Sequence, residues 1–382
     1  MKASLIHSNI IDIVDDLGYP IIGIIRHALY QCWWVCQNKK DSNIELEVHN
    51  WINAHLADCN LSRSFNQKMV LIYDETLHHE ILILLHKWFQ TKSCNLKNIF
   101  LITTHTSGAK IWYENYSKLV GETPFNLVEA TWLSREFVNR FNVPPVNETN
   151  LRKNLKFYFS YYGGSRSSYE KDFVVSLILS KSNLGYIDYL AGFHKNITSV
   201  GFKNYAEKTT NFLNENLVEQ LTCIRETHKF NNDMTDNLEP ERDEKFDCKG
   251  FQYKFDMTSG CQIVRETLNS TGFSIMTEKI IRPFLHLQLP MPLAVNAIDN
   301  LNNLGFNLDF DLIDYSYQHE PVLFHRLTKL LEQIEKLSAY KLSYLEEYIL
   351  NNKEKFLYNY EYIRSNTVFD NIKQQVIKEL TQ

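Results

Sequence analysis

Short apolar runs alternate with longer helical segments between residues 68 and 141. Three of the runs have the β-branched and aromatic composition of buried strands: 69–73, 99–103 and 125–128. Two segments between them place apolar residues three and four positions apart, as an amphipathic helix does: 79–89 and 110–119. A strand and a helix in regular alternation predict a parallel sheet with helical crossovers, so this part of the chain is expected to be an α/β domain.

A second series of the same kind begins at the run 157–162. A glycine-bearing loop, 163–168, and a helical run, 169–179, follow that strand-like run. The alternation resumes later in the chain with a strand, a helix, a strand and a short helix, expected at 262–264, 278–287, 293–295 and 297–304. We therefore expect a second α/β domain.

The best boundary between the two domains is the stretch 143–150, because two prolines and a polar tail break the alternation there. A chain of 382 residues also exceeds the roughly 250–300 residues that one core usually holds. From about residue 321 the pattern is helical to 337, and again from 341 to 362. The predicted organisation is two α/β domains and a helical tail that packs on them, at 1–145, 151–337 and 338–382.

Charge and hydropathy limit the classes of partner. The net charge of −5 and a pI near 6.2 give no overall attraction to nucleic acid, although a local basic groove stays possible. No apolar run approaches the roughly 20 residues that span a bilayer, and the first residues lack the pattern of a signal peptide. We expect a soluble cytoplasmic protein without a membrane span.

The most distinctive polar cluster lies between the strand-like run 262–264 and the helix expected after it. Glu266 opens the cluster, Asn269 and Ser270 follow, and the triplet 277–279 (Thr-Glu-Lys) closes it. Carboxylates, hydroxyls and a lysine at such a junction suit the ribose and diphosphate of a nucleotide sugar. The structural alternative is that Thr-Glu caps the helix and that the lysine is solvated.

This stretch, residues 266–281, resembles the donor-binding signature of the α1,3-fucosyltransferases. That family carries a Glu-Asn-Ser element, a Tyr-x-Thr-Glu-Lys element and an apolar helix in this order. A weaker similarity covers 156–173, where the family has a strand and then an arginine before a helix. The chain also resembles the divergent glycosyltransferase-like proteins of large phages, in which Thr-Glu-Lys is followed by a Gly-Phe pair such as Gly305-Phe306.

The resemblance implies a GT-B-like α/β fold, with two Rossmann-like domains facing a central cleft and C-terminal helices. It implies a role for five residues in donor binding. Glu278 would accept hydrogen bonds from the ribose hydroxyls, and Lys279 would neutralise the diphosphate. Arg166 would supply a second phosphate contact, Glu266 would orient the donor sugar, and Thr277 would cap the following helix and leave its amides facing phosphate.

Two departures from the family pattern leave the donor open between GDP- and UDP-sugars. Ile275 stands where the family has an aromatic residue near the donor base, with Phe273 close by. Thr267-Leu268 also interrupts the expected direct Glu-Asn-Ser continuity. The resemblance therefore implies a nucleotide sugar as co-substrate without fixing fucose.

A catalytic base is expected from the first domain. Asp74 and Glu75 directly follow the strand-like run 69–73, at the carboxyl end where α/β crevices form. Glu75 is the preferred base and His105 is the runner-up, while either acid alternatively just begins the next helix. We find no clear Asp-x-Asp motif of the metal-dependent class, so no metal site and no obligatory divalent ion are expected.

These expectations favour a metal-independent, inverting transferase that moves a hexose or pentose from a nucleotide sugar to a hydroxyl of a glycan or small molecule. Hydroxymethylated bases of viral DNA, modified in a host cytoplasm, are an alternative acceptor. A catalytically silent scaffold that binds partners through its helical C-terminus is another alternative. The polar aromatic segment 315–320 either closes over donor or acceptor, or is a surface turn.

Overall fold

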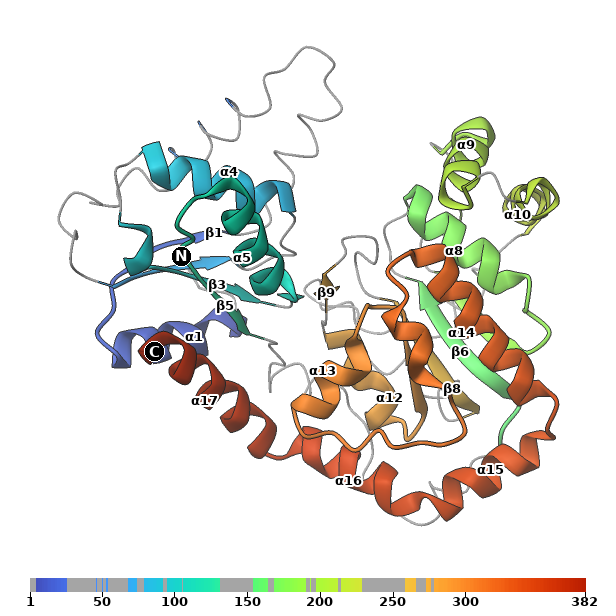
Figure 1. Ribbon diagram of the computed structural model, residues 1–382. Helices are drawn as coiled ribbons and strands as arrows, with labels where there is room; N and C mark the ends of the chain where they lie inside the picture. Colours follow the sequence, from blue (N-terminus) through green and yellow to red (C-terminus); the bar gives the residue numbers. More distant parts are fainter. Residues whose placement is uncertain are drawn as a thin grey trace, which may run out of the picture. The chain divides into compact units, whose positions relative to one another are not determined.

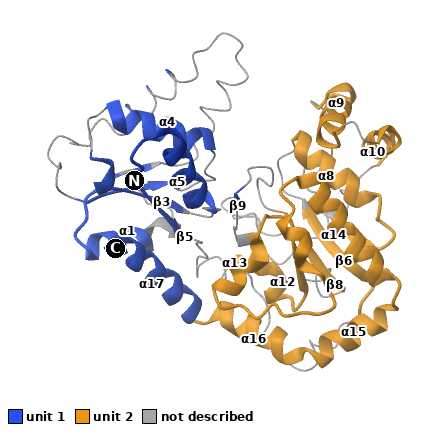
Figure 2. Cartoon of the chain, viewed as in Figure 1, with its two compact units in different colours: residues 1–136, 270–277, 366–382 blue, residues 137–269, 278–365 orange. Residues whose placement is uncertain are grey.

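The computed structural model describes most of the chain in two compact units. Unit 1 comprises residues 1–136, 270–277 and 366–382, and unit 2 comprises 137–269 and 278–365 (Figure 2). The described residues are 5–25, 46, 50, 53, 68–73, 79–91, 95–104, 106–130, 154–163, 168–189, 193, 197–211, 214–228, 258–265, 273–275 and 278–382. The expected boundary at 143–150 lies outside them.

Unit 1 contains a four-stranded parallel sheet in the order β1-β2-β3-β5. Its strands are β1 (Ile21–Ile25), β2 (Met69–Tyr73), β3 (Ile99–Thr104) and β5 (Asn126–Ala130). All five residues of β2 are buried, as expected for a central strand that is covered on both faces. The strands follow one another across the sheet in their order along the chain.

Helices cover both faces of this sheet. Figure 1 shows α4 (His79–Thr91) and α5 (Ala109–Val120) on one face, with α1 (Leu5–Asp16) and α17 (Thr367–Thr381) on the other. A short 3₁₀ turn, η2 (Leu96–Asn98), precedes β3. The last helix, α17, contacts β5 and α1, so the end of the chain belongs to the same unit as its beginning.

A short middle segment of the chain also belongs to unit 1. Strand β9 (Ser274–Ile275) pairs antiparallel with β4 (Thr106–Ser107). The preceding Phe273 is 3% exposed and lies in the core of unit 1. The segment 270–277 therefore leaves unit 2 and is held in unit 1 by a strand pair and by an aromatic anchor.

Unit 2 contains a second four-stranded parallel sheet, with the order β10-β8-β6-β7. Its strands are β6 (Phe157–Gly163), β7 (Gly185–Tyr189), β8 (Ser259–Val264) and β10 (Leu289–Pro292). The chain goes from β6 to β7 in one direction and then returns to place β8 on the other side of β6. The strand order thus reverses between β6 and β8.

The helices of unit 2 fall into two groups along the chain. After β6 come α8 (Tyr169–Leu179), α9 (Ser199–Thr209) and α10 (Glu215–Thr227), which contact one another. After β8 come η4 (Glu278–Ile281), α12 (Arg282–Leu285), α13 (Ala297–Asn303), η5 (Tyr315–His319), α14 (Leu323–Ser338), α15 (Leu342–Asn351) and α16 (Lys353–Arg364). Of the last three, α14 contacts β6 and α15 contacts β6 and β8.

The prediction of an α/β fold with parallel sheets is confirmed, and three local predictions need correction. The helix expected at 278–287 is a 3₁₀ turn followed by one helical turn, η4 and α12. The strand expected at 293–295 lies earlier, at 289–292, where two prolines concealed it; β10 is an edge strand, which tolerates proline. The helix expected at 341–362 is divided at Asn352 into α15 and α16.

The predicted tail of 338–382 is divided between the units. α15 and α16 lie in unit 2, whereas α17 lies in unit 1. In the described parts of the chain, no helix has the length and apolar character needed to cross a bilayer.

Candidate functional site

The two stretches that carry the family resemblance leave the sheet of unit 2 from neighbouring strands. β6 and β8 pair in parallel, with Phe159 opposite Cys261 and Tyr161 opposite Ile263. Because parallel strands end at the same edge, the chain beyond Gly163 and the chain beyond Val264 begin side by side. The strand order reverses between these two strands, and ligands of open α/β sheets bind outside the carboxyl ends at such a point.

Few of the predicted site residues lie within the described residues. Glu278 begins η4, and Lys279 follows it with a half-buried side chain. The other predicted residues lie outside: Asp74, Glu75, His105, Arg166, Glu266 and Thr277. Asp74 and Glu75 nevertheless come directly after Tyr73, the last residue of β2, so they follow a strand in the sequence, as expected.

The expected helix N-terminus after Thr277 is much reduced. η4 has 4 residues and α12 has 4 residues, whereas the macrodipole of a helix depends on several aligned turns. Among the predicted donor contacts, the charge of Lys279 is therefore a stronger candidate for holding phosphate than the amides of this turn.

Phe273, the aromatic residue near Ile275 in this stretch, packs in the core of unit 1. Its ring meets the His79 ring edge-on at a centroid distance of 4.3 Å and lies 6.1 Å from the Trp112 ring. Burial among these groups lowers the pKa of His79, while Glu80 opposes the shift. The stretch that resembles the donor signature thus contains a segment whose aromatic residue stabilises the core of unit 1.

Two buried ion pairs hold the first turn of α8, which follows β6. Ser168 caps this helix by accepting a hydrogen bond from the Lys171 amide at 3.2 Å. Glu170 accepts a bond of 3.2 Å from Arg265, and two residues further Asp172 accepts one of 3.0 Å from Arg225. Arg265 directly follows β8, so the first pair joins the end of β8 to the helix that follows β6. The burial of Arg265 could not be predicted from the sequence, because an arginine next to a polar cluster is normally expected on the surface.

A third buried arginine lies at the end of β10. Arg326 of α14 is fully buried and donates from Nε to the Leu293 carbonyl at 2.7 Å and from a terminal nitrogen to the Glu320 carbonyl. Burial lowers its pKa to about 10, while Glu170 and Glu320 oppose the shift. Arginine side chains thus reach the carboxyl ends of both β8 and β10.

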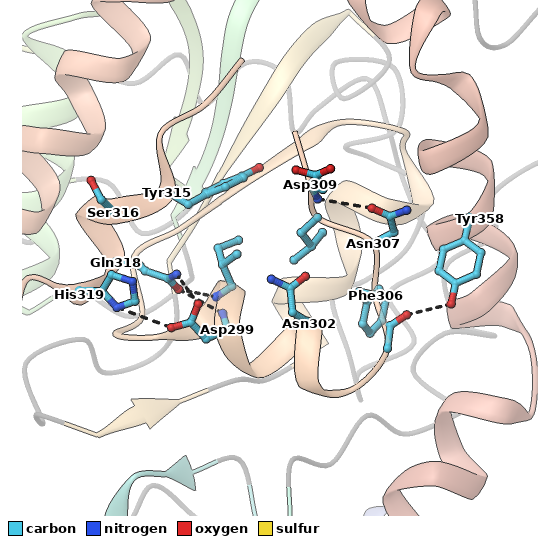
Figure 3. A pocket seen from close by; sticks show the side chains of 13 residues that line it. Asp299, Asn302, Phe306, Asn307, Asp309, Tyr315, Ser316, Gln318, His319 and Tyr358 are labelled. Atoms are coloured by element: carbon cyan, nitrogen blue, oxygen red, sulfur yellow. Dashed lines mark hydrogen bonds and ion pairs between the residues drawn. The ribbon is translucent and has the colours of Figure 1, made fainter. Parts of the chain in front are cut away.

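A separate cavity of about 660 Å³ lies along α13 in unit 2. Figure 3 shows His319, Gln318 and Asp299 on one side of it, and Asn307 and Tyr358 on the other. The buried Gln318 closes the start of α13, because its side-chain oxygen accepts from the Ile298 amide at 2.7 Å and its nitrogen donates to Asp299 at 3.0 Å. The polar segment 315–320 therefore forms one wall of this cavity, which sequence reading left open.

The lining of the cavity is polar and acidic. Asp299 and Asp309 contribute carboxylates, Asn302 and Asn307 contribute amides, and neither lysine nor arginine is among the described lining residues. Such groups suit hydroxyls or amines and repel phosphate. Lys279, the predicted donor residue whose side chain the structure describes, is not among the residues that line the cavity, so a diphosphate is better matched to the strand ends than to this cavity.

The stretch Asp309-Phe310-Asp311 has the Asp-x-Asp spacing of the metal-dependent class. Its central residue, Phe310, is buried and packs against Phe356 with ring centroids 4.8 Å apart. Asp309 lies 3.6 Å from Lys355, and Asp311 accepts a hydrogen bond of 2.7 Å from Tyr348. In the described residues, no group of three or more His, Cys, Asp or Glu side chains is arranged to hold a metal ion.

Comparisons with protein-family models, with curated proteins and with solved structures found no match.

Proposed function

We propose that this chain is a nucleotide-sugar-dependent glycosyltransferase of GT-B-like architecture that binds its donor at the carboxyl edge of the sheet in unit 2. The observation that carries the proposal is topological. Of the two stretches similar to the family, 156–173 contains β6 and the start of the helix after it, and 266–281 follows β8; β6 and β8 are neighbours in a parallel sheet. The strand order reverses between them, and this is where α/β sheets bind nucleotides.

The roles of individual residues follow from the resemblance. Glu278 accepts hydrogen bonds from the ribose, Lys279 and Arg166 neutralise the diphosphate, and Glu266 orients the sugar. A base of unit 1, with Glu75 preferred over Asp74 and His105, removes the proton of the acceptor hydroxyl as the nucleotide leaves. The reaction is a direct displacement at the anomeric carbon and needs no obligatory metal ion.

Donor binding tests the proposal through Lys279. Titration calorimetry with a panel of GDP- and UDP-sugars is expected to find one donor that binds the unmodified protein. The Lys279→Ala variant should bind it at least about tenfold more weakly, because a hydrogen bond to a charged group contributes about 1.5–3 kcal/mol. If no sugar nucleotide binds, or if the variant binds as tightly as the unmodified protein, the proposal is wrong.

A matched control is available on the same sheet. Lys156 is exposed and directly precedes β6, so it lies at the amino end of the strand whose carboxyl end we assign to the donor. Lys156→Ala should leave donor affinity unchanged. An equal loss in both variants would indicate a general effect of surface charge instead of a phosphate contact.

The acceptor is identified by transfer assays with the donor that binds. Glycans and small hydroxyl compounds form one set of acceptors, and DNA with hydroxymethylated bases forms the other. We expect transfer to the first set, because the net charge of −5 gives no overall attraction to DNA. Transfer to DNA alone would overturn that acceptor class and leave the donor assignment standing.

A further inference from the structure

Five polar side chains gather at the carboxyl edge of the sheet in unit 2, where the sequence had predicted only the loop residues. They come from two strand ends and three helices: Tyr161 (β6), Arg265 (after β8), Glu170 (α8), Tyr205 (α9) and Arg326 (α14). Burial raises the pKa of Tyr161 to about 12, and Arg265 and Glu170 both act on it. The same two charges act on Tyr205, so these groups are close neighbours.

Two guanidinium groups of this cluster lie near the same carboxylate. Glu170 accepts a hydrogen bond of 3.2 Å from Arg265, and its charge also acts on Arg326. A buried guanidinium is costly unless its donors are satisfied by hydrogen bonds or by an anion.

Two buried polar atoms of the cluster also lack a partner. Arg265 is 7% exposed, and no group in the described part of the chain accepts a hydrogen bond from its Nε. The hydroxyl of Tyr161, on a fully buried side chain of the adjacent strand, has no partner there either. A buried donor without an acceptor is rare in native proteins. Tyr161 belongs to β6 and Arg265 directly follows β8, and the strand order reverses between these two strands.

We propose that this cluster is a binding site for a phosphate-type anion, in which Arg265 donates from Nε to the anion and Glu170 sets the strength of binding by competing for the same guanidinium. In the complete enzyme the anion is the diphosphate of the donor, so this inference rests on the proposed function and adds Arg265 to the phosphate contacts. A guanidinium presents several donors in one plane, which suits two oxygens of a diphosphate.

The second ion pair of α8 supplies matched controls. Asp172 pairs with Arg225 at 3.0 Å, and Arg225 also donates to the Ile197 carbonyl at 2.6 Å. This pair has the same chemistry, the same helix and similar burial. If Arg265 served only to anchor α8, the two pairs would respond alike.

The test is calorimetric titration of the full chain with inorganic pyrophosphate at low ionic strength, where screening is weak. Arg265→Lys should weaken binding by about tenfold or more, because the planar donors are lost. Glu170→Gln should strengthen binding by about threefold or more, because the competing carboxylate is removed. Arg225→Lys and Asp172→Asn should leave the affinity unchanged. Circular dichroism shows whether each variant is folded. If Arg265→Lys does not fold, the pyrophosphate affinity of Glu170→Gln tests the inference by itself.

The inference is overturned if the unmodified protein does not bind pyrophosphate, if Glu170→Gln leaves binding unchanged or weakens it, or if the control pair gives the same changes. Its failure can be told apart from failure of the proposed function. If sugar nucleotides bind and their affinities do not change in Arg265→Lys and Glu170→Gln, the inference is wrong and the proposed function stands. If pyrophosphate binding changes as expected in the variants but no sugar nucleotide binds, the proposed function is wrong and the inference stands.

Discussion

The two sheets have the same number of parallel strands and differ in how the chain winds through them. In unit 1 the described strands lie in their order along the chain, β1-β2-β3-β5, whereas in unit 2 the order reverses between β6 and β8. Only a reversal sends the connections after two adjacent strands to opposite faces, and this opens a crevice at the strand ends. The comparison explains why we assign the donor to unit 2.

The two units also differ in the polar groups that they bury. Among the described residues, all the buried arginine, aspartate and glutamate side chains belong to unit 2. Unit 1 buries His86, Thr103 and Ser117 within a core that is otherwise apolar and aromatic. Buried charges are costly and are retained mainly where they serve a structural or functional need. Unit 2 is therefore the unit in which the described core includes buried ion pairs.

The chain itself supplies a probe for each unit. All six tryptophans lie within residues 1–136, so they belong to unit 1. Tryptophan fluorescence thus follows the unfolding of unit 1, and far-ultraviolet circular dichroism follows both units. Substitutions in unit 2 are expected to shift the second signal and leave the first in place.

The largest effect is expected from Arg326→Met in unit 2. The substitution removes charged donors from the carbonyls of Leu293 and Glu320, and we expect it to lower the free energy of unfolding by about 3–5 kcal/mol. Urea titration followed by circular dichroism measures the loss.

The exposed Arg364 is the control for this loss. It donates to the Tyr360 hydroxyl at 2.6 Å, and Arg364→Met should cost less than about 1 kcal/mol. A similar cost for the two substitutions would show that burial of arginine does not distinguish unit 2.

An intermediate effect is expected from His86→Leu in unit 1. His86 is 1% exposed; its Nδ1 meets the Tyr113 hydroxyl, and its Nε2 lies 2.6 Å from the Glu122 carboxylate. The apolar substitute leaves the buried hydroxyl without this partner, which should cost about 1–3 kcal/mol. The midpoint of the tryptophan fluorescence transition in urea reports the change.

Glu122→Gln provides the comparison for His86. Its side chain is 37% exposed and its amide can still accept a hydrogen bond, so a cost below about 1 kcal/mol is expected. If His86→Leu left the free energy of unfolding unchanged, the contacts of His86 with Tyr113 and Glu122 would not stabilise the packing of α4 against α5.

The smallest effect is a difference in pH dependence between the units. Burial raises the pKa of Glu129 in unit 1, and hydrogen bonds, the first from the Lys110 amide, oppose the shift. An acid with a raised pKa in the folded state costs stability while it is ionised, and the cost disappears as the pH falls through that pKa. Glu129→Gln should therefore stabilise unit 1 at neutral pH, with an advantage that shrinks as the pH falls toward 4.5.

Asp314 in unit 2 should behave in the opposite way. Hydrogen bonds from Ser316, the first from its amide, lower the pKa of Asp314. Its stabilising contribution is therefore present above the usual value of 3.8 and is lost as the pH falls through the lowered pKa. Asp314→Asn should destabilise unit 2 at neutral pH, with a deficit that shrinks below pH 3.8. Urea midpoints by fluorescence for Glu129 and by circular dichroism for Asp314 test both signs, and slopes of the same sign would contradict this contrast.

The predictability of the fold varied with the kind of local signal. β2 was predicted to the residue, because five successive apolar residues allow no amphipathic helix and no turn. The segment after Thr277 was predicted as one long helix, but Pro283 lies inside it and the structure has only η4 and α12 there. β10 was displaced because Pro290 and Pro292 resemble a loop, and only its edge position makes them tolerable.

For the candidate site, Glu278, Lys279 and the strand within 156–173 could be predicted from the sequence, as could most of the strand before 266–281. The sequence did not supply Arg265, Glu170 or Arg326 as a group. Their positions span 157 residues, 170–326, and no local pattern relates such distant positions. A charged residue is normally exposed, so burial of these three side chains cannot be inferred before the packing is known.

The sequence by itself determined the α/β class and the order of most strands and helices, because hydrophobic periodicity is a local property that each segment carries alone. Only the tertiary structure decided the reversal between β6 and β8, the transfer of 270–277 and of α17 to unit 1, and the burial of Arg265 and Arg326 at the strand ends. The physical reason is the same in each case. Strand order, unit membership and burial depend on which distant segments pack together, and the free energy of that packing belongs to the pair of surfaces and not to either sequence segment.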